Sequence, residues 1–195
     1  MGIQLIVGLG NPGPEYRDTR HNAGANLVEA LGHKFGANFA EDKKFHGYIA
    51  RVTINGSDVR LLLPTTYMNN SGRAVAAVAN FFKIPIEDIL VAHDEIDLPP
   101  GTARFKQGGS GGGNGVKDVI ACLANNKNFW RLRIGVGHPG SAAQVVDYVL
   151  KRPRAEEQPL IDDSIDEAID ALPLAINGQW EKAMQALHTN TPKAN

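Results

Sequence analysis

Two short apolar segments constrain the fold of this chain most. Residues 3–9, which are apolar apart from Gln4, and residues 89–92 form short apolar runs, the first ended by Gly10 and the second by the polar residues 93–95. Such runs are typical of strands buried on both faces of a largely parallel sheet. Apolar residues at three-to-four spacing over 23–35, 74–82 and 116–123 predict helices between these strands. The alternation of predicted strands and helices along the chain indicates an α/β fold.

Other segments complete the expected architecture. Alternating residues over 48–54, the turn Asn55-Gly56 and the apolar run 59–63 predict a hairpin. Strands are expected over 102–107 and 132–136, and helices dominate 141–188. We therefore predict a single α/β domain, residues 1–188, with a twisted mixed sheet flanked by helices and an inserted hairpin. The polar tail 189–195 is expected to be mobile.

Composition excludes several classes of protein. Of 195 residues, 43% are apolar and 21% charged, as in ordinary globular domains. The apolar runs are far shorter than the ~20 residues of a membrane span, and no signal-peptide pattern opens the chain, so we expect a cytosolic protein with no membrane partner. The single cysteine, Cys122, cannot form an internal disulfide.

The charge distribution is more informative than the total of −1. Residues 99–140 carry a net charge of +5, whereas residues 1–98 carry −2 and residues 141–195 carry −4. The basic segment surrounds a glycine-rich stretch, 108–115, with Tyr67, Phe105 and Trp130 as aromatic residues expected near it. Basic and aromatic side chains together favour a nucleic-acid-binding surface there.

Two glycine motifs have competing interpretations. Residues 8–13 match GxGxxG, but Pro12 and Gly13-Pro14 favour a turn, and no acidic residue follows at the spacing of a dinucleotide site. Residues 108–112 match GxSxG, which would make Ser110 a nucleophile with Asp147 and His188 as partners. The same glycines could instead bring backbone N–H groups close to a phosphate ahead of a helix, or form an uncharged, flexible surface loop.

His21 is the strongest candidate base. It lies in the polar run Thr19-Arg20-His21-Asn22, after the first strand and at the start of the first helix. Asp94 follows the other buried strand and could hydrogen-bond the imidazole, because ligand sites in α/β folds lie beyond the carboxyl ends of parallel strands. No pair of histidines has metal-binding spacing, so no metal or other cofactor is expected.

Five segments carry a resemblance to a known family. They are GLGNPGPEY at 8–16, TRHNAG at 19–24, PTTYMNNSG at 64–72, HDEIDLPPG at 93–101 and RLRIGVGHPG at 131–140. In this order, and over about residues 3–188, the chain resembles bacterial-type peptidyl-tRNA hydrolase. The resemblance implies a cytosolic, monomeric, metal-free esterase that cleaves the ester between a peptide and the 3′-terminal ribose of tRNA.

The resemblance also implies roles for individual residues. His21 corresponds to the general base, Asp94 to the carboxylate that orients it, and Asn11 to the amide that distinguishes a peptidyl substrate from free aminoacyl-tRNA. Contacts to tRNA are implied for Tyr16, Tyr67, Asn69 and Asn114, a place in the cleft for Met68, and a clamp on the 5′ phosphate for Lys106 and Arg133 with Arg104 beside them.

The glycine-rich loop departs from the family pattern. The family commonly has GGGHGGHNG, whereas residues 108–115 read GGSGGGNG, which is one residue shorter and has Gly113 where the second histidine would be. Two alternatives to the hydrolase therefore stay open. One is a tRNA-binding module that has lost useful catalysis, and the other is a small-molecule esterase that uses Ser110.

Overall fold

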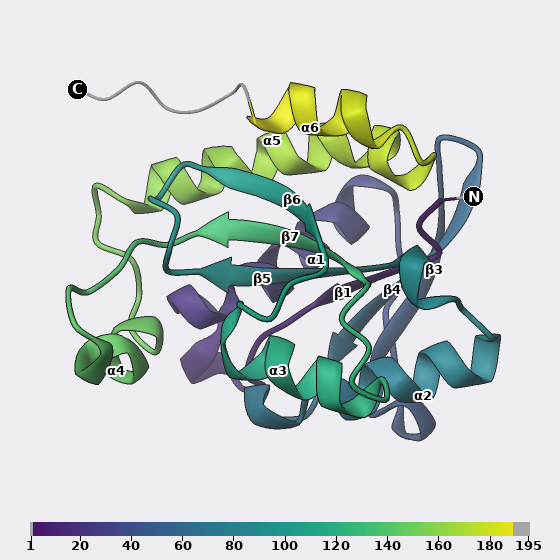
Figure 1. Cartoon of the computed structure of the whole chain (residues 1–195), viewed down its shortest axis with the longest axis horizontal. Coiled ribbons are helices and arrows are strands. Elements are labelled where there is room, and N and C mark those ends of the chain that lie inside the picture. Colours follow the sequence, from purple (N-terminus) through teal and green to yellow (C-terminus); the bar gives the residue numbers. More distant parts are fainter. Residues whose placement is uncertain (1, 189–195) are drawn as a thin grey trace.

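The computed structural model describes residues 2–188, which form one mixed sheet with helices on both faces (Figure 1). The sheet order is β2-β3-β4-β1-β5-β7-β6. Its strands are β1 (Leu5–Gly8), β2 (Ala40–Asp42), β3 (Gly47–Ile54), β4 (Ser57–Pro64), β5 (Ile89–Glu95), β6 (Ala103–Gln107) and β7 (Trp130–Gly135). β1 pairs in parallel with β4 and β5, and β5 with β7, whereas the other pairs are antiparallel. The predicted mixed sheet is confirmed.

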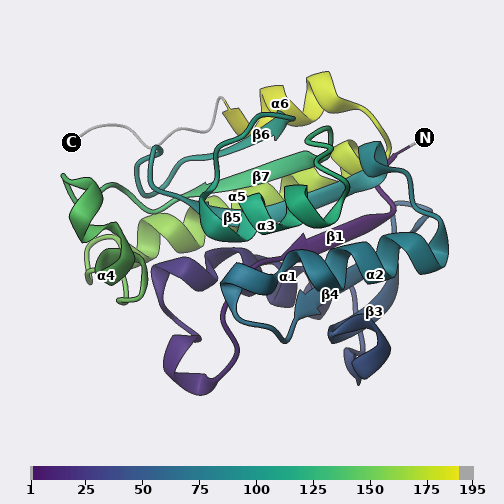
Figure 2. The same cartoon turned by 60° about the horizontal axis from the view of Figure 1, so that its bottom comes forward.

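The helices cover both faces of the sheet. One face packs against α1 (Ala23–Lys34), α5 (Gln158–Ile176) and α6 (Trp180–His188), and the other against α2 (Gly72–Phe82) and α3 (Gly113–Cys122). Figure 2 shows α2 and α3 in front of the sheet and α5 behind it. Side chains of β1 alternate between the two cores, with Ile6 in one and Leu5 and Val7 in the other. Burial on both faces explains the uninterrupted apolar run in the sequence.

One predicted boundary shifts in the region that carries the site, and His21 lies just before the helix that it was expected to open. Strand β5 continues past Ala92 through His93, Asp94 and Glu95, because these residues still pair with β7. Asp94 therefore lies within a strand and not in the loop after it. Helix α1 begins at Ala23 after a 3-10 turn, Arg20–Asn22. The short edge strand β2 was not predicted, because three mostly exposed residues carry no apolar pattern.

The remaining expectations concern the hairpin, the tail and the membrane. The predicted hairpin is confirmed as β3 and β4, whose turn residues Asn55 and Gly56 both have positive φ. The expectation for residues 189–195 lies outside the described residues. Within residues 2–188, no helix combines the length and apolarity needed to cross a lipid bilayer.

Candidate active site

A cleft of about 740 Å³ opens at the carboxyl ends of β1 and β5. Its walls come from the loops after β1 and β4, the end of β5, the start of α3 and the helix α4 (Val145–Val149). Seven of the residues selected from the sequence line it: Asn11, His21, Tyr67, Met68, Asn69, Asp94 and Asn114. Segments far apart in the chain thus bring most of the predicted site together.

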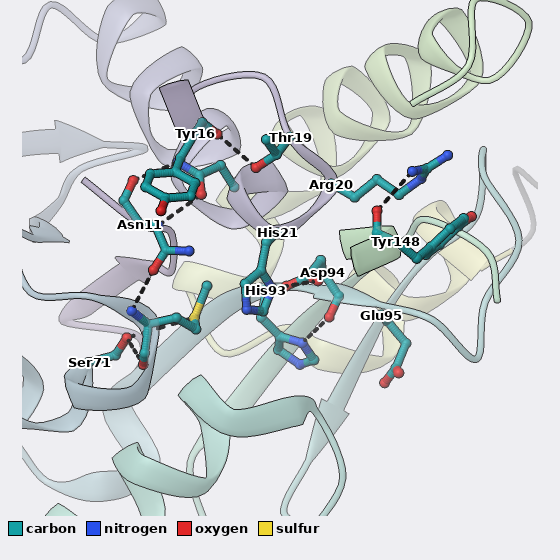
Figure 3. Close-up of polar contacts among 12 residues, drawn as sticks. Asn11, Tyr16, Thr19, Arg20, His21, Ser71, His93, Asp94, Glu95 and Tyr148 are labelled. Atoms are coloured by element: carbon teal, nitrogen blue, oxygen red, sulfur yellow. Dashed lines mark hydrogen bonds and ion pairs between the residues drawn. The ribbon is translucent and has the colours of Figure 1, made fainter. Parts of the chain in front are cut away.

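His21 and Asp94 form a hydrogen-bonded pair in this cleft (Figure 3). His21 Nδ1 lies 2.9 Å and 3.1 Å from the two carboxylate oxygens of Asp94. Their side chains are 16% and 7% exposed, so bulk water screens the pair weakly. Among the described residues, Asp94 is the only hydrogen-bonding partner of the His21 ring. The Nδ1–H tautomer is thereby favoured, and Nε2 keeps its lone pair for a water molecule.

The environment of His21 sets its pKa by two opposing effects. Burial by itself lowers the pKa, whereas the hydrogen bond from Nδ1 to Asp94 and the carboxylate charge raise it. The net result is a pKa above the ordinary value of histidine. A histidine tuned in this way is a stronger base than a free one, and it becomes neutral and able to accept a proton only above its raised pKa.

Asn11 is held rigidly near the start of the loop that follows β1. Its side-chain oxygen accepts a hydrogen bond from the backbone N–H of Met68 at 2.7 Å. Its backbone N–H donates to the Asn22 side chain at 2.8 Å, and the Asn22 amide donates back to the Asn11 carbonyl at 2.9 Å. With the oxygen occupied, the Asn11 NH₂ group is the part left to meet a ligand in the cleft.

The loop between β4 and α2 supplies the next wall. Met68 is buried, and Tyr67 beside it is 59% exposed. The ring of Tyr67 meets Tyr16 edge-on, with centroids 6.4 Å apart. Asn69 is exposed and also faces the cleft. Tyr16 does not line the cavity itself, so it extends the aromatic surface outward from the cleft.

The glycine-rich loop ends directly in α3. Gly112 and Gly113 have φ values of 117° and 78°, which L residues with side chains rarely adopt. A Cβ on Gly112 would also approach Val116 Cγ2 to 2.8 Å. The helix therefore starts at Gly113, three residues earlier than the apolar pattern predicts, and Asn114 stands in its exposed first turn facing the cleft.

The basic residues predicted to bind phosphate lie on β6 and β7, the two strands at the β6 edge of the sheet. Arg104 of β6 is directly opposite Arg133 of β7, and Lys106 is opposite Arg131. Lys106 is exposed, whereas Arg133 is half-buried and donates through Nε to Glu95 at 2.9 Å. The three residues predicted to clamp phosphate are therefore neighbours, outside the cleft cavity but on strands that adjoin it.

Arg131 does not belong to this exposed basic surface. It is only 2% exposed and donates to the carbonyls of Lys127, Phe129 and Gly109. Burial lowers the pKa of its guanidinium to about 10. Its charge contributed to the count of +5, but its side chain serves to hold the glycine-rich loop at Gly109.

Two aromatic side chains expected to contribute to the basic surface are not available to it. Phe105 and Trp130 are both buried on the face covered by α6, although the backbone of Trp130 pairs with Gln107, directly before the glycine-rich loop. Trp130 stacks on Trp180 of that helix with ring centroids 3.4 Å apart. Sequence alone could not place them, because strand residues alternate between faces and the covering helix α6 begins 50 residues after Trp130 and 75 residues after Phe105. Tyr67 is the exposed aromatic of the three.

The Ser110 triad is not assembled. His188 Nε2 accepts a hydrogen bond from the backbone N–H of Phe105 at 2.7 Å, so this nitrogen is engaged at the edge strand β6. Ser110 itself lies exposed in the glycine-rich loop.

The GxGxxG match also fails as a dinucleotide site, because the turn after Gly13 is a 3-10 turn and α1 starts ten residues after Gly13. In the part of the chain that the structure describes, no three His, Cys, Asp or Glu side chains gather as metal ligands would.

Sequence reasoning missed residues that position the site. Asn22 anchors the Asn11 loop, Glu95 holds Arg133, and Asp118 of α3 accepts a hydrogen bond from the first backbone N–H of α2 at 2.8 Å. Asn22 and Glu95 directly follow His21 and Asp94 in the sequence. These positions, inside the two polar motifs, were the sequence signal that could have indicated a role for both residues in the site.

The fold and the site define a class: an α/β protein whose cleft holds a carboxylate-oriented histidine next to a basic strand pair. A family model described as peptidyl-tRNA hydrolase matches residues 5–195. The chain belongs to the peptidyl-tRNA hydrolase family. A protein of that name from Tolumonas auensis is 59% identical over 189 residues, which are 96% of this chain and 95% of the relative. The corresponding protein of Erwinia tasmaniensis is 56% identical over 96% of both chains.

A solved structure agrees with this assignment. The crystal structure of peptidyl-tRNA hydrolase from Acinetobacter baumannii superposes with a TM-score of 0.94 at 49% identity. The match covers 98% of this chain and 97% of the other. The predicted family and fold class are both confirmed.

Proposed function

We propose that His21 is the general base of this peptidyl-tRNA hydrolase, which cleaves peptidyl-tRNA and releases the peptide and free tRNA. Membership of the family supports the reaction. The observation that carries the assignment of the base is the buried hydrogen bond from His21 Nδ1 to Asp94, which leaves Nε2 toward the cleft. An acyl ester is activated enough for direct attack by water, so the reaction needs neither a covalent intermediate nor a metal.

The proton can be followed through the proposed reaction. His21 Nε2 removes a proton from water as the water oxygen attacks the ester carbonyl, and the imidazolium that forms is stabilised by Asp94. The tetrahedral intermediate then collapses, the bond to the ribose oxygen breaks, and His21 returns the proton to that oxygen. The Asn69 amide, at the cleft wall, is a candidate donor to the oxyanion and could supply about 3 kcal/mol of transition-state stabilisation.

Asn11 is proposed to recognise the blocked amino group. Its NH₂ faces outward because its oxygen is bonded to Met68. A donor at this position can bond the carbonyl of a peptide or acetyl group, but it repels the ammonium group of free aminoacyl-tRNA. The rigid anchoring by Asn22 fixes that preference.

Binding of tRNA is proposed to involve phosphate contacts and stacking. Lys106, Arg104 and the Nη groups of Arg133 would meet the 5′ phosphate end, whereas Tyr16, Tyr67 and Asn114 would meet the acceptor end. Phosphate contacts carry affinity without base sequence, which suits an enzyme that acts on many tRNAs.

Paired substrates test the proposal. We expect N-acetyl-aminoacyl-tRNA to be cleaved and free aminoacyl-tRNA to be spared, and His21→Ala to abolish turnover while tRNA binding persists. Equal cleavage of both substrates, or full activity of His21→Ala, would refute the assignment.

Two further variants test the alternatives. Binding without turnover in the natural protein, with activity gained in Gly113→His, would indicate a tRNA-binding module. Loss of activity in Ser110→Ala would instead favour the serine esterase.

We also propose that residues 1–188 act as one domain, as a monomer in the cytoplasm. Light scattering at working concentration, and the activity of a chain ending at His188, would test these points. A dimer, or loss of activity on removal of 189–195, would contradict them.

A further inference from the structure

Arg20 stands beside the proposed base, but its charge does not enter the cleft. The residue is 5% exposed and begins the 3-10 turn that carries His21. Its two terminal nitrogens donate to the backbone carbonyl of Tyr148 at 2.9 Å and to the carboxylate of Glu157 at 3.1 Å. Figure 3 shows Arg20 and Tyr148 on the far side of His21 from Asn11.

Further contacts tie the same two segments together. The guanidinium carbon of Arg20 lies 3.7 Å from the centre of the Tyr148 ring. The backbone N–H of Arg20 donates to the carbonyl of Lys151 at 3.0 Å. The Tyr148 hydroxyl in turn donates to the carbonyl of Val136 at 2.7 Å, just after β7. The turn with His21 and the segment around α4 are thus joined through one arginine.

The segment that Arg20 holds is the apolar wall of the cleft. Val145, Val146, Val149 and Leu150 line the cavity together with His21 and Asp94. Val146 is 63% exposed and Leu150 is 38% exposed, so both keep apolar surface for a ligand. A substrate acyl group that reaches His21 must lie next to this wall. The distance between wall and base therefore limits which acyl groups fit.

Stability alone is a weak reason for this arrangement. A buried ion pair often contributes no more to folding than apolar side chains of the same volume would. Glu157 also accepts hydrogen bonds from Arg154, so its carboxylate would keep a partner without Arg20. What Arg154 does not replace is the contact of the Arg20 guanidinium with Tyr148: Arg20 covers the Tyr148 ring and donates to its carbonyl, which otherwise accepts only from the backbone N–H of Lys151 among the described residues.

We propose that Arg20 is a positioning residue that sets the width of the cleft between His21 and the apolar wall formed by α4 and Leu150, and so tunes which acyl groups are bound. The inference rests on the proposed role of His21. It assigns Arg20 no contact with the reacting atoms. Lysine at this position could keep the ion pair with Glu157, but it offers neither the fork nor the flat face that Tyr148 contacts.

The test compares Arg20→Lys with Arg51→Met, a control that removes an arginine from an exposed ion pair with Asp58 on the β3–β4 hairpin. Hydrogen exchange is measured first, because it needs no activity. In Arg20→Lys we expect exchange of the amides of 145–150 to rise about tenfold, and exchange in the hairpin to stay unchanged. Unchanged exchange at 145–150 would overturn the proposal even if the protein were inactive on every tRNA substrate.

Kinetics then separate positioning from general damage. For N-acetyl-leucyl-tRNA we expect KM to rise about tenfold in Arg20→Lys, and for N-acetyl-glycyl-tRNA much less, with kcat and the acid limb of the pH profile unchanged for both. An equal fall in kcat for both substrates, or a shifted acid limb, would mean that Arg20 acts on His21 itself and would overturn the proposal. If Arg20→Lys does not fold, Arg20→Met with Glu157→Gln removes both charges, and the same outcomes apply.

Discussion

Replacing Asp94 by asparagine is the sharpest test of how the proposed base works. The substitution keeps the size of the side chain, and the amide oxygen can still accept a hydrogen bond from His21 Nδ1 in place of the carboxylate oxygens now 2.9 Å and 3.1 Å away. What disappears is the negative charge. The variant therefore separates the orientation of the imidazole from its electrostatic support.

The sign of the expected pKa change follows from the causes of the present shift. Burial lowers the pKa of His21, and only the bond to Asp94 and its charge raise it. Without the charge, burial prevails and the pKa falls. Since the neutral imidazole is the active form, the acid limb of kcat/KM should move to lower pH in Asp94→Asn.

The plateau rate should fall although more of the base is neutral. A hydrogen bond to a charged group contributes about 1.5–3 kcal/mol, and the imidazolium in the transition state loses this support. At about 1.4 kcal/mol for each factor of ten, the plateau of kcat/KM should fall roughly 10- to 150-fold. A weaker base also transfers the proton less readily, which changes the rate in the same direction.

The assay is the initial rate of N-acetyl-aminoacyl-tRNA cleavage from about pH 5 to about pH 9, with spontaneous hydrolysis subtracted. Asp58→Asn is the matched control, because Asp58 pairs with Arg51 on the exposed hairpin. An acid limb that stays in place or moves to higher pH in Asp94→Asn, or a plateau within about twofold of the natural protein, would refute the reasoning.

Three other substitutions probe the surroundings of the cleft. Lys106→Ala should raise KM for all tRNAs alike and lower the slope of log binding against log salt by about 1, whereas the exposed Lys43→Ala should do neither. Arg131→Met should lower the free energy of unfolding in urea by about 2–4 kcal/mol, because it removes three hydrogen bonds that a buried guanidinium donates to the carbonyls of Lys127, Phe129 and Gly109; no change would mean that water replaces the guanidinium. Gly112→Ala should raise KM through its positive φ and the clash with α3, and Gly111→Ala, which has open space, should not.

The sequence allowed the centre of the site to be predicted because its signals are local. The apolar run of β1 and the motif around His21 define a strand, a turn and a helix, and the same holds for β5 and Asp94. Parallel strands place their carboxyl ends at one edge, so two local predictions sufficed to bring His21 and Asp94 together. In the structure, β1 and β5 end side by side, with Gly8 opposite Ala92, and His21 Nδ1 lies 2.9 Å from Asp94.

The functions of the arginines could not be predicted in the same way. Arg20, Arg131 and Arg133 look alike in a charge count, but the first two are buried and bonded to carbonyls, whereas the third is half-buried and paired with Glu95. Each arginine bonds to a residue more than 20 positions away in the sequence. These contacts are Arg20–Glu157, Arg131–Gly109 and Arg133–Glu95. Only the tertiary structure separates a cation that binds phosphate from one that holds a loop.

The spacing of the His21–Asp94 pair depends on a residue that has no chemistry of its own. Gly24 lies one helical turn after His21, and a Cβ there would lie 2.1 Å from the carbonyl oxygen of Ala92 in β5. Ordinary contact requires about 3.5 Å, so any side chain would push the start of α1 outward by more than about 1 Å. A displacement of that size would stretch the 2.9 Å bond between His21 and Asp94 beyond hydrogen-bonding range. The glycine in the TRHNAG motif is therefore as necessary to the proposed catalytic pair as the histidine.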